Sequence, residues 1–409
     1  MNKSWSAAAA AVGGMAVLAA CGGGGSSATA AGDGSGSVKI GVVLPLTGVQ
    51  AAIARTESLG AQVAAKQIND AGGAGGKFTI DLVQKDDQLS TAQSAAIVRQ
   101  LKSEGVELAM GIQTTDLCKA MAQAAQPLGI LVLGSHCSSH TLVEPPVTSD
   151  YWMSSAIDTD LTKAEGNFLA EKFPNIKTWD VFGYDQAVTR GFWTQTAAQM
   201  SAKLGRPVQA GQEAYVPVGT TDYRTQLSAQ VSGLKGSKQD RGLFLGVYGA
   251  GTTSYIQQAR PLGLLDDYAA VAQIGVYWTT AKALKGTAPS IYDVHEYFWS
   301  CQQNAENDAF VKAYEALAGE KPDTGAYQGY ISVKLLAAAV AKAGKTDSAS
   351  VQKAMAGLSI DTPAGVKLTM DATSHHADGP ITVAELVGDP AAPDGVALRS
   401  CKVMQASAL

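Results

Sequence analysis

The stretch SVKIGVVLPLTGVQAAIARTESLG, residues 37–60, decides the fold. It opens with the apolar run Val38–Leu44, which is interrupted at two positions only. A short run of this kind, rich in Val and Ile and followed by turn residues, is typical of a buried strand. We expect a helix from about Arg55, because apolar residues then recur at helical spacing. Strand, loop and helix open a parallel α/β unit, in which ligands bind at the loop after the strand. Residues 47–55 are therefore a first candidate binding segment.

The same alternation continues along the chain and predicts a doubly wound α/β architecture with two similar lobes. Further strands are expected at 77–84, 106–110, 130–133, 178–183, 208–216, 242–248 and 270–276. The intervening helices are expected at 90–104, 119–128, 160–173, 191–203, 224–232 and 253–262. After Trp278 the rhythm changes, and we expect a strand at 291–299, helices at 304–318, 326–343 and 348–357, and strands at 366–370, 381–387 and 396–404.

Length and composition restrict the class of protein. The 409 residues suffice for two or three domains, and an apolar content of 46% fits a globular protein. The net charge of −5 argues against a nucleic-acid-binding surface. After the N-terminal region, no stretch of the sequence is long and apolar enough to span a bilayer.

The N-terminal region has the pattern of an export signal. Residues 1–20 carry one charge, at Lys3, followed by a short run of small apolar residues. The run ends in Leu-Ala-Ala before Cys21, which resembles a bacterial lipobox, so Cys21 is expected to be lipidated after cleavage. Residues 21–37 are mainly Gly, Ser and Ala and are expected to form a flexible tether.

Four further cysteines follow Cys21, and an even number in an exported protein indicates two disulfides. Three pairings are open. We favour Cys118–Cys137 with Cys301–Cys401, because the first pair closes a short segment within one βα region.

Several short motifs, in order, resemble one family. They are Lys39-Ile40-Gly41, Leu44-Pro45-Leu46-Thr47-Gly48, Gln67-Ile68-Asn69-Asp70-Ala71-Gly72-Gly73, Lys85-Asp86-Asp87, Met370-Asp371 and His375-His376. From Val38 to the C-terminus the chain is similar to the type I periplasmic solute-binding proteins of ABC importers, the branched-chain amino acid receptor group.

The resemblance implies a fold of two doubly wound lobes joined by three hinge crossovers, which we place near Ile157, Thr280 and Asp361. Lobe one is then expected to comprise 38–157 plus 281–361, and lobe two 158–280 plus 362–409. It also implies that a small-molecule ligand binds between the lobes, that the hinge closes on it, and that the closed form is passed to ABC permease and ATPase subunits. We also expect that the protein is a monomer without a cofactor. Its expected location is extracytoplasmic, at the cell envelope, where a lipid anchors it.

The family also implies where a ligand carboxylate binds. In this family, small hydroxyl residues after the third and fourth strands hold that group, together with backbone N–H groups at helix starts. Thr115 and Ser135 match those positions, flanked by Gln113, Thr114 and His136.

Lobe two is expected to supply the closing face. Tyr248 matches a tyrosine that packs on the ligand in this family, whereas Ile53 and Val188 occupy positions where the family has tyrosines. Tyr277 and Trp278 follow the strand at 270–276 and offer further stacking surface for an aromatic or apolar carboxylate.

The loop after 270–276 lacks the acidic residue with which amino-acid receptors of this family pair the ligand's ammonium. Neither Asp116 nor Asp185 stands at the matching position. A buried ammonium without a partner is costly. We therefore hypothesise that the ligand lacks an α-amine or that its amine is bound differently.

Two other classes of function are compatible with parts of the sequence. Residues 134–140 place Ser, His and Cys close together, which is compatible with a metal-dependent or serine hydrolase, but they follow a strand and form a loop without a second ligand pair. The sequence has no G-x-S-x-G motif, so we expect no enzyme activity. A ligand-sensing co-receptor of the same fold is the other alternative.

Overall fold

The computed structural model describes residues 36–48, 50–275, 278–392 and 394–409. The predicted signal peptide, Cys21 and Tyr277 lie outside the described residues. Strand β1 begins at Gly36, so the last two residues of the predicted tether belong to the fold. Within the described part of the chain, none of the helices has both the length and the apolar character needed to cross a bilayer.

The first sheet has five parallel strands in the order β2-β1-β3-β4-β5. The strands are β1 (Gly36–Leu44), β2 (Phe78–Asp86), β3 (Leu108–Gly111), β4 (Leu131–Gly134) and β5 (Tyr151–Met153). Strands β3 and β4 are buried along their whole length, as expected for parallel strands covered on both faces. Strand β5 was missed from the sequence because it has only three residues.

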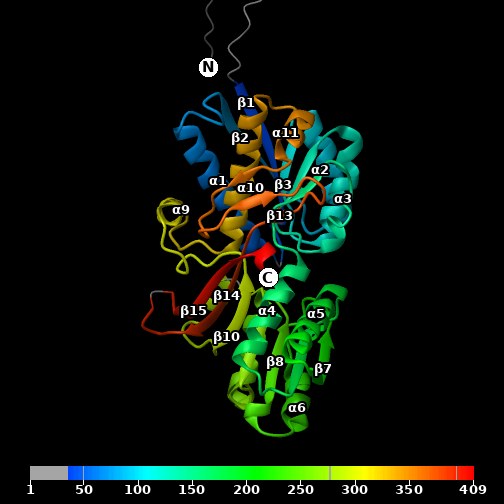
Figure 1. The fold of residues 1–409 in the computed structure, drawn as a ribbon, viewed down its shortest axis with the longest axis vertical. Coiled ribbons are helices and arrows are strands. Elements are labelled where there is room, and N and C mark those ends of the chain that lie inside the picture. Colours follow the sequence, from blue (N-terminus) through cyan, green and yellow to red (C-terminus); the bar gives the residue numbers. More distant parts are fainter. Residues whose placement is uncertain (1–35, 49, 276–277, 393) are drawn as a thin grey trace, which may run out of the picture. The chain divides into compact units, whose positions relative to one another are not determined.

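Helices from two separate parts of the chain pack on this sheet (Figure 1). They are α1 (Ala51–Asp70), α2 (Thr91–Ser103), α3 (Thr115–Ala125), α10 (Thr324–Ala343) and α11 (Ser348–Met355). Helix α2 is capped by Ser90, whose hydroxyl accepts a hydrogen bond from the Gln93 N–H at 3.3 Å. Helices α1 and α10 pack closely through Gly60 and Gly329, where an added Cβ would collide with the backbone of the other helix.

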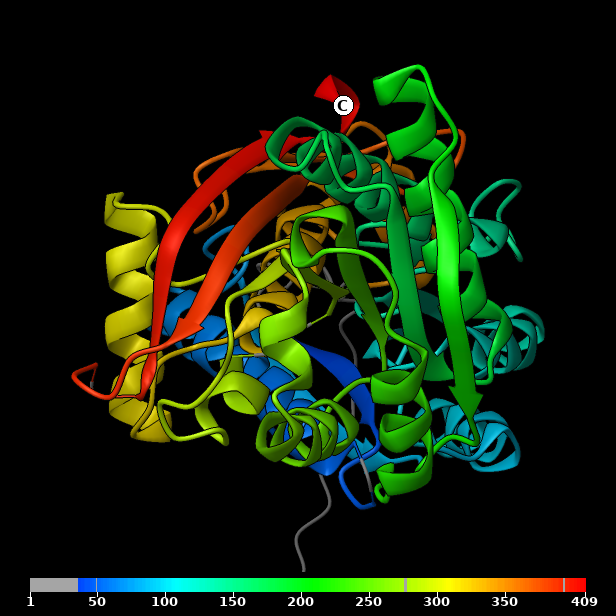
Figure 2. The same ribbon diagram turned by 90° about the horizontal axis from the view of Figure 1, so that it is seen from below.

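The second sheet has seven strands in the order β15-β14-β10-β9-β8-β6-β7. They are β6 (Thr178–Tyr184), β7 (Gln209–Val216), β8 (Arg241–Gly246), β9 (Ala270–Ile274), β10 (Ile291–His295), β14 (Pro380–Gly388) and β15 (Val396–Gln405). Strands β6 to β10 pair in parallel, whereas β14 pairs antiparallel with both β10 and β15. Figure 2 shows β14 and β15 side by side at one edge.

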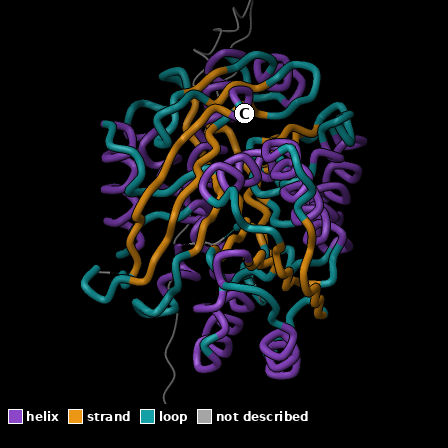
Figure 3. Tube along the Cα trace, turned by 60° about the horizontal axis from the view of Figure 1, so that its bottom comes forward, coloured by secondary structure: helices purple, strands orange, loops and turns teal. Residues whose placement is uncertain are grey.

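Helices flank the strands of the second sheet as well (Figure 3). They are α4 (Asp158–Lys172), α5 (Ala187–Leu204), α6 (Arg224–Gly233), α7 (Ala250–Ala259) and the short α8 (Trp278–Lys282). The predicted mixed α/β class with parallel sheets is confirmed.

Two of the predicted crossover positions are wrong. Strand β10 was assigned to lobe one, but it pairs with β9 and β14 in the second sheet, so the chain returns to the first sheet after His295 rather than near Thr280. Helix α9 (Ala305–Ala318) follows that return. The small sheet β11 (Ser359–Ile360), β12 (Leu368–Met370) and β13 (Ala377–Asp378) shares its core with α10, so the last crossing follows Asp378 rather than Asp361.

Both favoured disulfides are present. Cys118 and Cys137 have Cα atoms 6.5 Å apart, and Cys301 and Cys401 have Cα atoms 5.9 Å apart. The first joins the first turn of α3 to the loop after β4, and the second joins the segment after β10 to β15.

Candidate functional site

A cavity of about 720 Å³ lies where the strand ends of the two sheets and the crossing segments meet. This volume is typical of small-molecule sites. The loops of the first sheet contribute Gln50, Gln113–Asp116, His136 and Ser138–Thr141. The second sheet and its helices contribute Leu161, Gln186–Val188, Gly191, Phe192, Gln195, Tyr248, Ile274 and Gly275. Ser155 and Glu296 come from segments that cross between the sheets, and Asp158 and His295 stand next to those segments at the start of α4 and the end of β10.

The start of helix α3 opens into this cavity. Strand β3 ends at Gly111, and Ile112 then adopts a positive φ of 77°, which turns the chain so that Thr114 becomes the N-cap of the helix. Gln113, Thr114 and Thr115 line the cavity. The first N–H groups of a helix have no partner within it and favour an anion. This end of the cavity can therefore receive a carboxylate.

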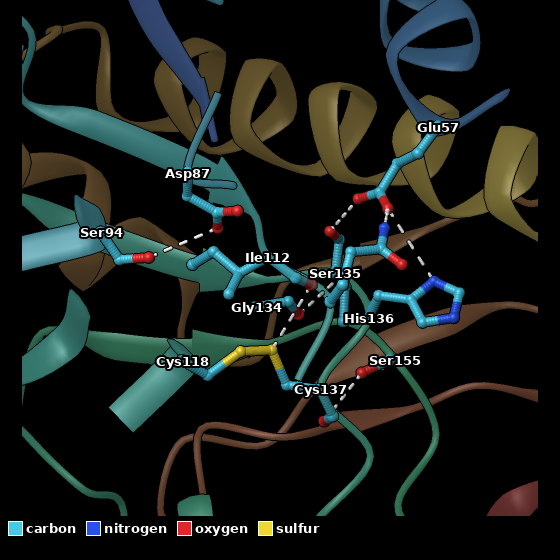
Figure 4. The surroundings of a disulfide bond; sticks show 12 residues. Glu57, Asp87, Ser94, Ile112, Cys118, Gly134, Ser135, His136, Cys137 and Ser155 are labelled. Atoms are coloured by element: carbon cyan, nitrogen blue, oxygen red, sulfur yellow. Dashed lines mark hydrogen bonds and ion pairs between the residues drawn. A yellow bond between two sulfur atoms is a disulfide. The ribbon is translucent and has the colours of Figure 1, made fainter. Parts of the chain in front are cut away.

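Ser135 does not line the cavity, although the resemblance assigns it to the ligand. It is fully buried, and its hydroxyl donates to the carboxyl group of Glu57 on α1. Gln113 Nε2 donates to the other Glu57 oxygen, and His136 Nδ1 lies 3.9 Å from it. Figure 4 shows Ser135 and His136 converging on Glu57 next to the Cys118–Cys137 disulfide. Ser135 thus lies behind the cavity wall, whereas Gln113 and His136 are part of it.

Burial dominates the electrostatics of this cluster. The side chain of Glu57 is completely buried, and burial raises its pKa to about 8, opposed by the hydrogen bonds from Ser135 and Gln113. Burial lowers the pKa of His136 to about 4. At neutral pH the cavity wall therefore contains the neutral imidazole of His136, and the neutral acid Glu57 lies behind it.

The second sheet presents an aromatic face to the same cavity. The Tyr248 hydroxyl donates to Gln186 Oε1 at 3.1 Å, and its ring packs edge-on against Tyr184 with centroids 4.9 Å apart. Both Tyr248 and Gln186 line the cavity, together with the exposed side chain of Val188 and with Phe192. This face combines an apolar surface with one amide.

Two residues predicted from the family positions lie elsewhere. Ile53 is buried inside α1, because the helix begins at Ala51 rather than near Arg55. Trp278 is buried in the core of the second sheet, where its Nε1–H donates to Asp394 at 3.1 Å and its ring contacts Trp299. Neither belongs to the residues that line the cavity.

The crossing segments contribute polar residues that sequence reasoning missed. Glu296 accepts hydrogen bonds from the Ala156 N–H at 3.0 Å and from Gln328 Nε2 at 2.7 Å. Asp158 Oδ1 lies 2.8 Å from His140 Nδ1 and also accepts from the His140 N–H at 3.0 Å. Glu296, Asp158 and His140 line the cavity, whereas Ala156 and Gln328 do not. Glu296 directly follows β10, whereas the strand expected at 291–299 placed it inside a strand, so no sequence signal marked it.

Burial and charge oppose each other at the His295–Glu296 pair. Burial alone would lower the pKa of His295, but the carboxylates of Asp293 and Glu296 raise it. Burial alone would raise the pKa of Glu296, but His295 lowers it overall. The two side chains approach to 3.9 Å and therefore favour the ionised pair.

The described residues that line the cavity include no Lys or Arg, but they include the carboxylates of Asp116, Asp158 and Glu296. Asp185, by contrast, pairs with Arg190 at 2.9 Å and is not among them. The charged imidazole of His295 is already paired with Glu296, so N–H and hydroxyl groups are the remaining donors for an anionic group. A cationic group would find carboxylates at the crossing segments.

The segment 134–140 is divided among structural roles. Cys137 is bonded to Cys118, Ser135 to Glu57, and His140 to Asp158. In the part of the chain that the structure covers, no three His, Cys, Asp or Glu side chains are grouped so that they could hold a metal ion.

Comparison with known proteins agrees with this architecture. The leucine-, isoleucine-, valine-, threonine- and alanine-binding protein of Pseudomonas aeruginosa is 24% identical over 337 residues, which cover 80% of this chain and 84% of the relative. An isoleucine complex of a branched-chain amino acid transporter substrate-binding protein from Streptococcus pneumoniae superposes with a TM-score of 0.77 at 22% identity, covering 90% of this chain and 99% of that one.

A solute-binding protein of an ABC transporter from Rhodopseudomonas palustris, in complex with 3,4-dihydroxybenzoic acid, has a TM-score of 0.78 at 19% identity, covering 90% of this chain and 98% of that one. These structures show the two-lobed fold of type I periplasmic binding proteins. Residues 37–391 match the family described as periplasmic binding protein, and the chain belongs to that family.

Proposed function

We propose that this protein is the extracytoplasmic substrate-binding component of an ABC importer and that it captures a small organic carboxylate in the cavity by hinge closure. One observation carries the proposal: the N-terminus of α3, with Thr114 and Thr115, and the Tyr248–Gln186 face belong to different sheets and line the same cavity. A ligand that contacts both can shift the open–closed balance, because only differential affinity for the two states can do so. The closed form is then recognised by the permease.

The carboxylate is expected at Gln113, Thr114 and Thr115, which line the cavity at the start of α3. The remainder of the ligand is expected against Tyr248 and Phe192. A non-amino aromatic or aliphatic acid fits this apolar face. It also fits the lack of an acidic side chain in the loop after β9, because such a ligand has no ammonium group to pair. An amino acid is the alternative, and its ammonium would be bound differently from the family pattern, at Asp158 or Glu296.

Titration calorimetry distinguishes these ligand classes. Benzoate, 4-hydroxybenzoate and L-leucine are titrated separately into the purified protein. Tight benzoate binding with no leucine heat supports the non-amino acid, and tight leucine binding supports the amino acid. If neither class binds, small molecules released from the denatured protein are identified by mass spectrometry, and the absence of any carboxylate among them contradicts the proposal.

We further propose that Cys21 carries the lipid that holds the protein at the cell envelope. The lipobox-like Leu-Ala-Ala before Cys21 and the Gly- and Ser-rich segment after it support this. Metabolic labelling with a palmitate analogue tests it. The wild-type protein should incorporate label and partition with membranes, whereas Cys21→Ala should not; equal labelling of both contradicts the proposal.

A further inference from the structure

The buried acid Glu57 lies behind the part of the cavity wall that is expected to receive the ligand's carboxylate. It projects from α1, and its two oxygens contact residues from two different strand ends. One oxygen is bonded to Ser135 after β4, and the other to Gln113 after β3. His136 Nδ1 is 3.9 Å from the second oxygen. Because Gln113 and His136 line the cavity, Glu57 contacts two residues of the cavity wall from behind.

The contacts of Glu57 do not require it to be ionised. As a carboxylate it accepts from both Ser135 and Gln113. As a neutral acid it can donate its proton to Ser135 Oγ while Gln113 still donates to the other oxygen. The geometry is therefore preserved in both states, and what changes on ionisation is the buried charge.

The groups that face Glu57 do not compensate that charge. The N-cap residue of α10, Asp323, and Asp87 after β2 both raise its pKa in addition to burial. The facing group on the loop after β4 is His136, which is neutral above about pH 4. An ionised Glu57 would thus add a negative charge next to the wall, and the charged His295 at the cavity is already paired with the carboxylate of Glu296.

We propose that Glu57 is a positioning and specificity-determining residue: the neutral acid holds Gln113, Ser135 and His136 in place for an anionic ligand, and its ionised form disfavours that ligand. This rests on the proposed binding of a carboxylate in the cavity. Affinity for the carboxylate then falls as Glu57 ionises, because the two negative charges repel each other across a wall of low dielectric. The protein would bind its ligand well at neutral and mildly acidic pH and release it in alkaline solution.

The variant Glu57→Gln imitates the neutral acid. Its amide can donate to Ser135 and accept from Gln113, so the contacts are kept while the ionisation is removed. Glu165→Gln is the matched control. Glu165 is also fully buried with a pKa well above its usual value, and its hydrogen bond is to Thr196, but it does not line the cavity or touch Gln113.

The test is calorimetric titration with benzoate, or with L-leucine if that acid is the one that binds, at about pH 6.5 and about pH 9. We expect the wild type and Glu165→Gln to lose about tenfold in affinity over this range, and Glu57→Gln to change by less than about twofold. A wild-type profile that is flat, or a Glu57→Gln profile that follows the wild type, overturns the proposal.

If neither acid binds at either pH, the proposed carboxylate function fails, and the proposal is decided on the free protein. The carbon-13 carboxyl resonance that disappears in Glu57→Gln is titrated by NMR in the wild type. A midpoint near pH 8 supports the neutral acid. A midpoint below about pH 6 overturns it.

Discussion

The carboxylate of Glu296 accepts the backbone N–H of Ala156 at 3.0 Å, and this bond joins two of the segments that cross between the sheets. Glu296 also accepts from Gln328 and from the Thr324 hydroxyl at 3.3 Å, both on α10. The Glu296 carbonyl in turn accepts from the Thr382 hydroxyl on β14 at 3.1 Å. Glu296, which lines the cavity, is thus bonded to the crossing segment that contains Ala156, to α10 on the first sheet and to β14 in the second sheet.

Glu296→Ala is expected to destabilise the protein by about 3 kcal/mol, because buried donors on Ala156 and Gln328 lose their acceptor. Urea denaturation measures this loss. Glu306→Ala serves as control, since its partner Lys334 lies at a partly exposed position and the pair contributes about 1 kcal/mol or less. A loss for Glu296→Ala no larger than that of the control contradicts the assignment.

The free energy of unfolding should fall as pH rises from about 6 to about 8. Folded Glu57 has a pKa near 8, above its usual value of 4.5, so the folded state holds a proton that the unfolded state has lost, and stability declines through this window. The raised pKa of His295 acts in the same direction. Glu57→Gln should remove about 2 kcal/mol of the decline, measured by denaturation at several pH values. Asp361 is an exposed group whose pKa is lowered, so Asp361→Asn should leave this decline in the free energy of unfolding unchanged.

Tyr248→Ala is expected to weaken binding of the ligand about tenfold or more, because it removes an aromatic surface from the cavity. Tyr248→Phe keeps the ring and loses only the bond to Gln186, so a smaller loss is expected. Calorimetry with the identified ligand measures both.

Trp278→Phe provides the contrast to these variants. Trp278 is buried away from the cavity, so its replacement should lower the unfolding temperature and leave ligand affinity within about twofold of the wild type. If Trp278→Phe abolished binding while Tyr248→Ala did not, the assignment of the cavity face would be wrong.

Removing the Cys118–Cys137 disulfide with a Cys118→Ser/Cys137→Ser variant should cost about 3 kcal/mol in stability, as expected for a loop of this length. The bond also ties the first turn of α3 to the loop that carries His136, so ligand affinity should fall as well. Removing Cys301–Cys401 should cost more stability, since it closes 100 residues, and it should not affect affinity because neither cysteine lines the cavity. Equal loss of affinity in both variants contradicts the expected role of the first bond.

Local pattern was enough to predict most elements, because strands such as β1 and β8 are short apolar runs. Helix starts were predicted less well, since α1 begins at Ala51 rather than near Arg55 and α3 begins at Thr115 rather than Lys119. Strand partners were not predictable in the same way. The run that begins at Ile291 looks the same whether it joins the first sheet or the second, and only its long-range pairing with β9 and β14 decides. The crossover positions were therefore misplaced.

The site could be predicted only where it follows directly from strand ends. Gln113, Thr114, Thr115 and His136 stand immediately after β3 and β4, and all of them line the cavity. Glu57 was missed because a glutamate in a helix is usually exposed. Its spacing from Ala54 and Ala61 places it on the buried face of α1, and that helical periodicity was the signal available.

The most direct test of the central claim is calorimetric titration of the identified carboxylate into the wild type, Thr115→Val and Tyr248→Ala. We predict one site per chain in the wild type and a loss of about tenfold or more in each variant, because the two residues hold the ligand from different sheets. Affinity unchanged in both variants would contradict a ligand held between the strand ends of the two sheets.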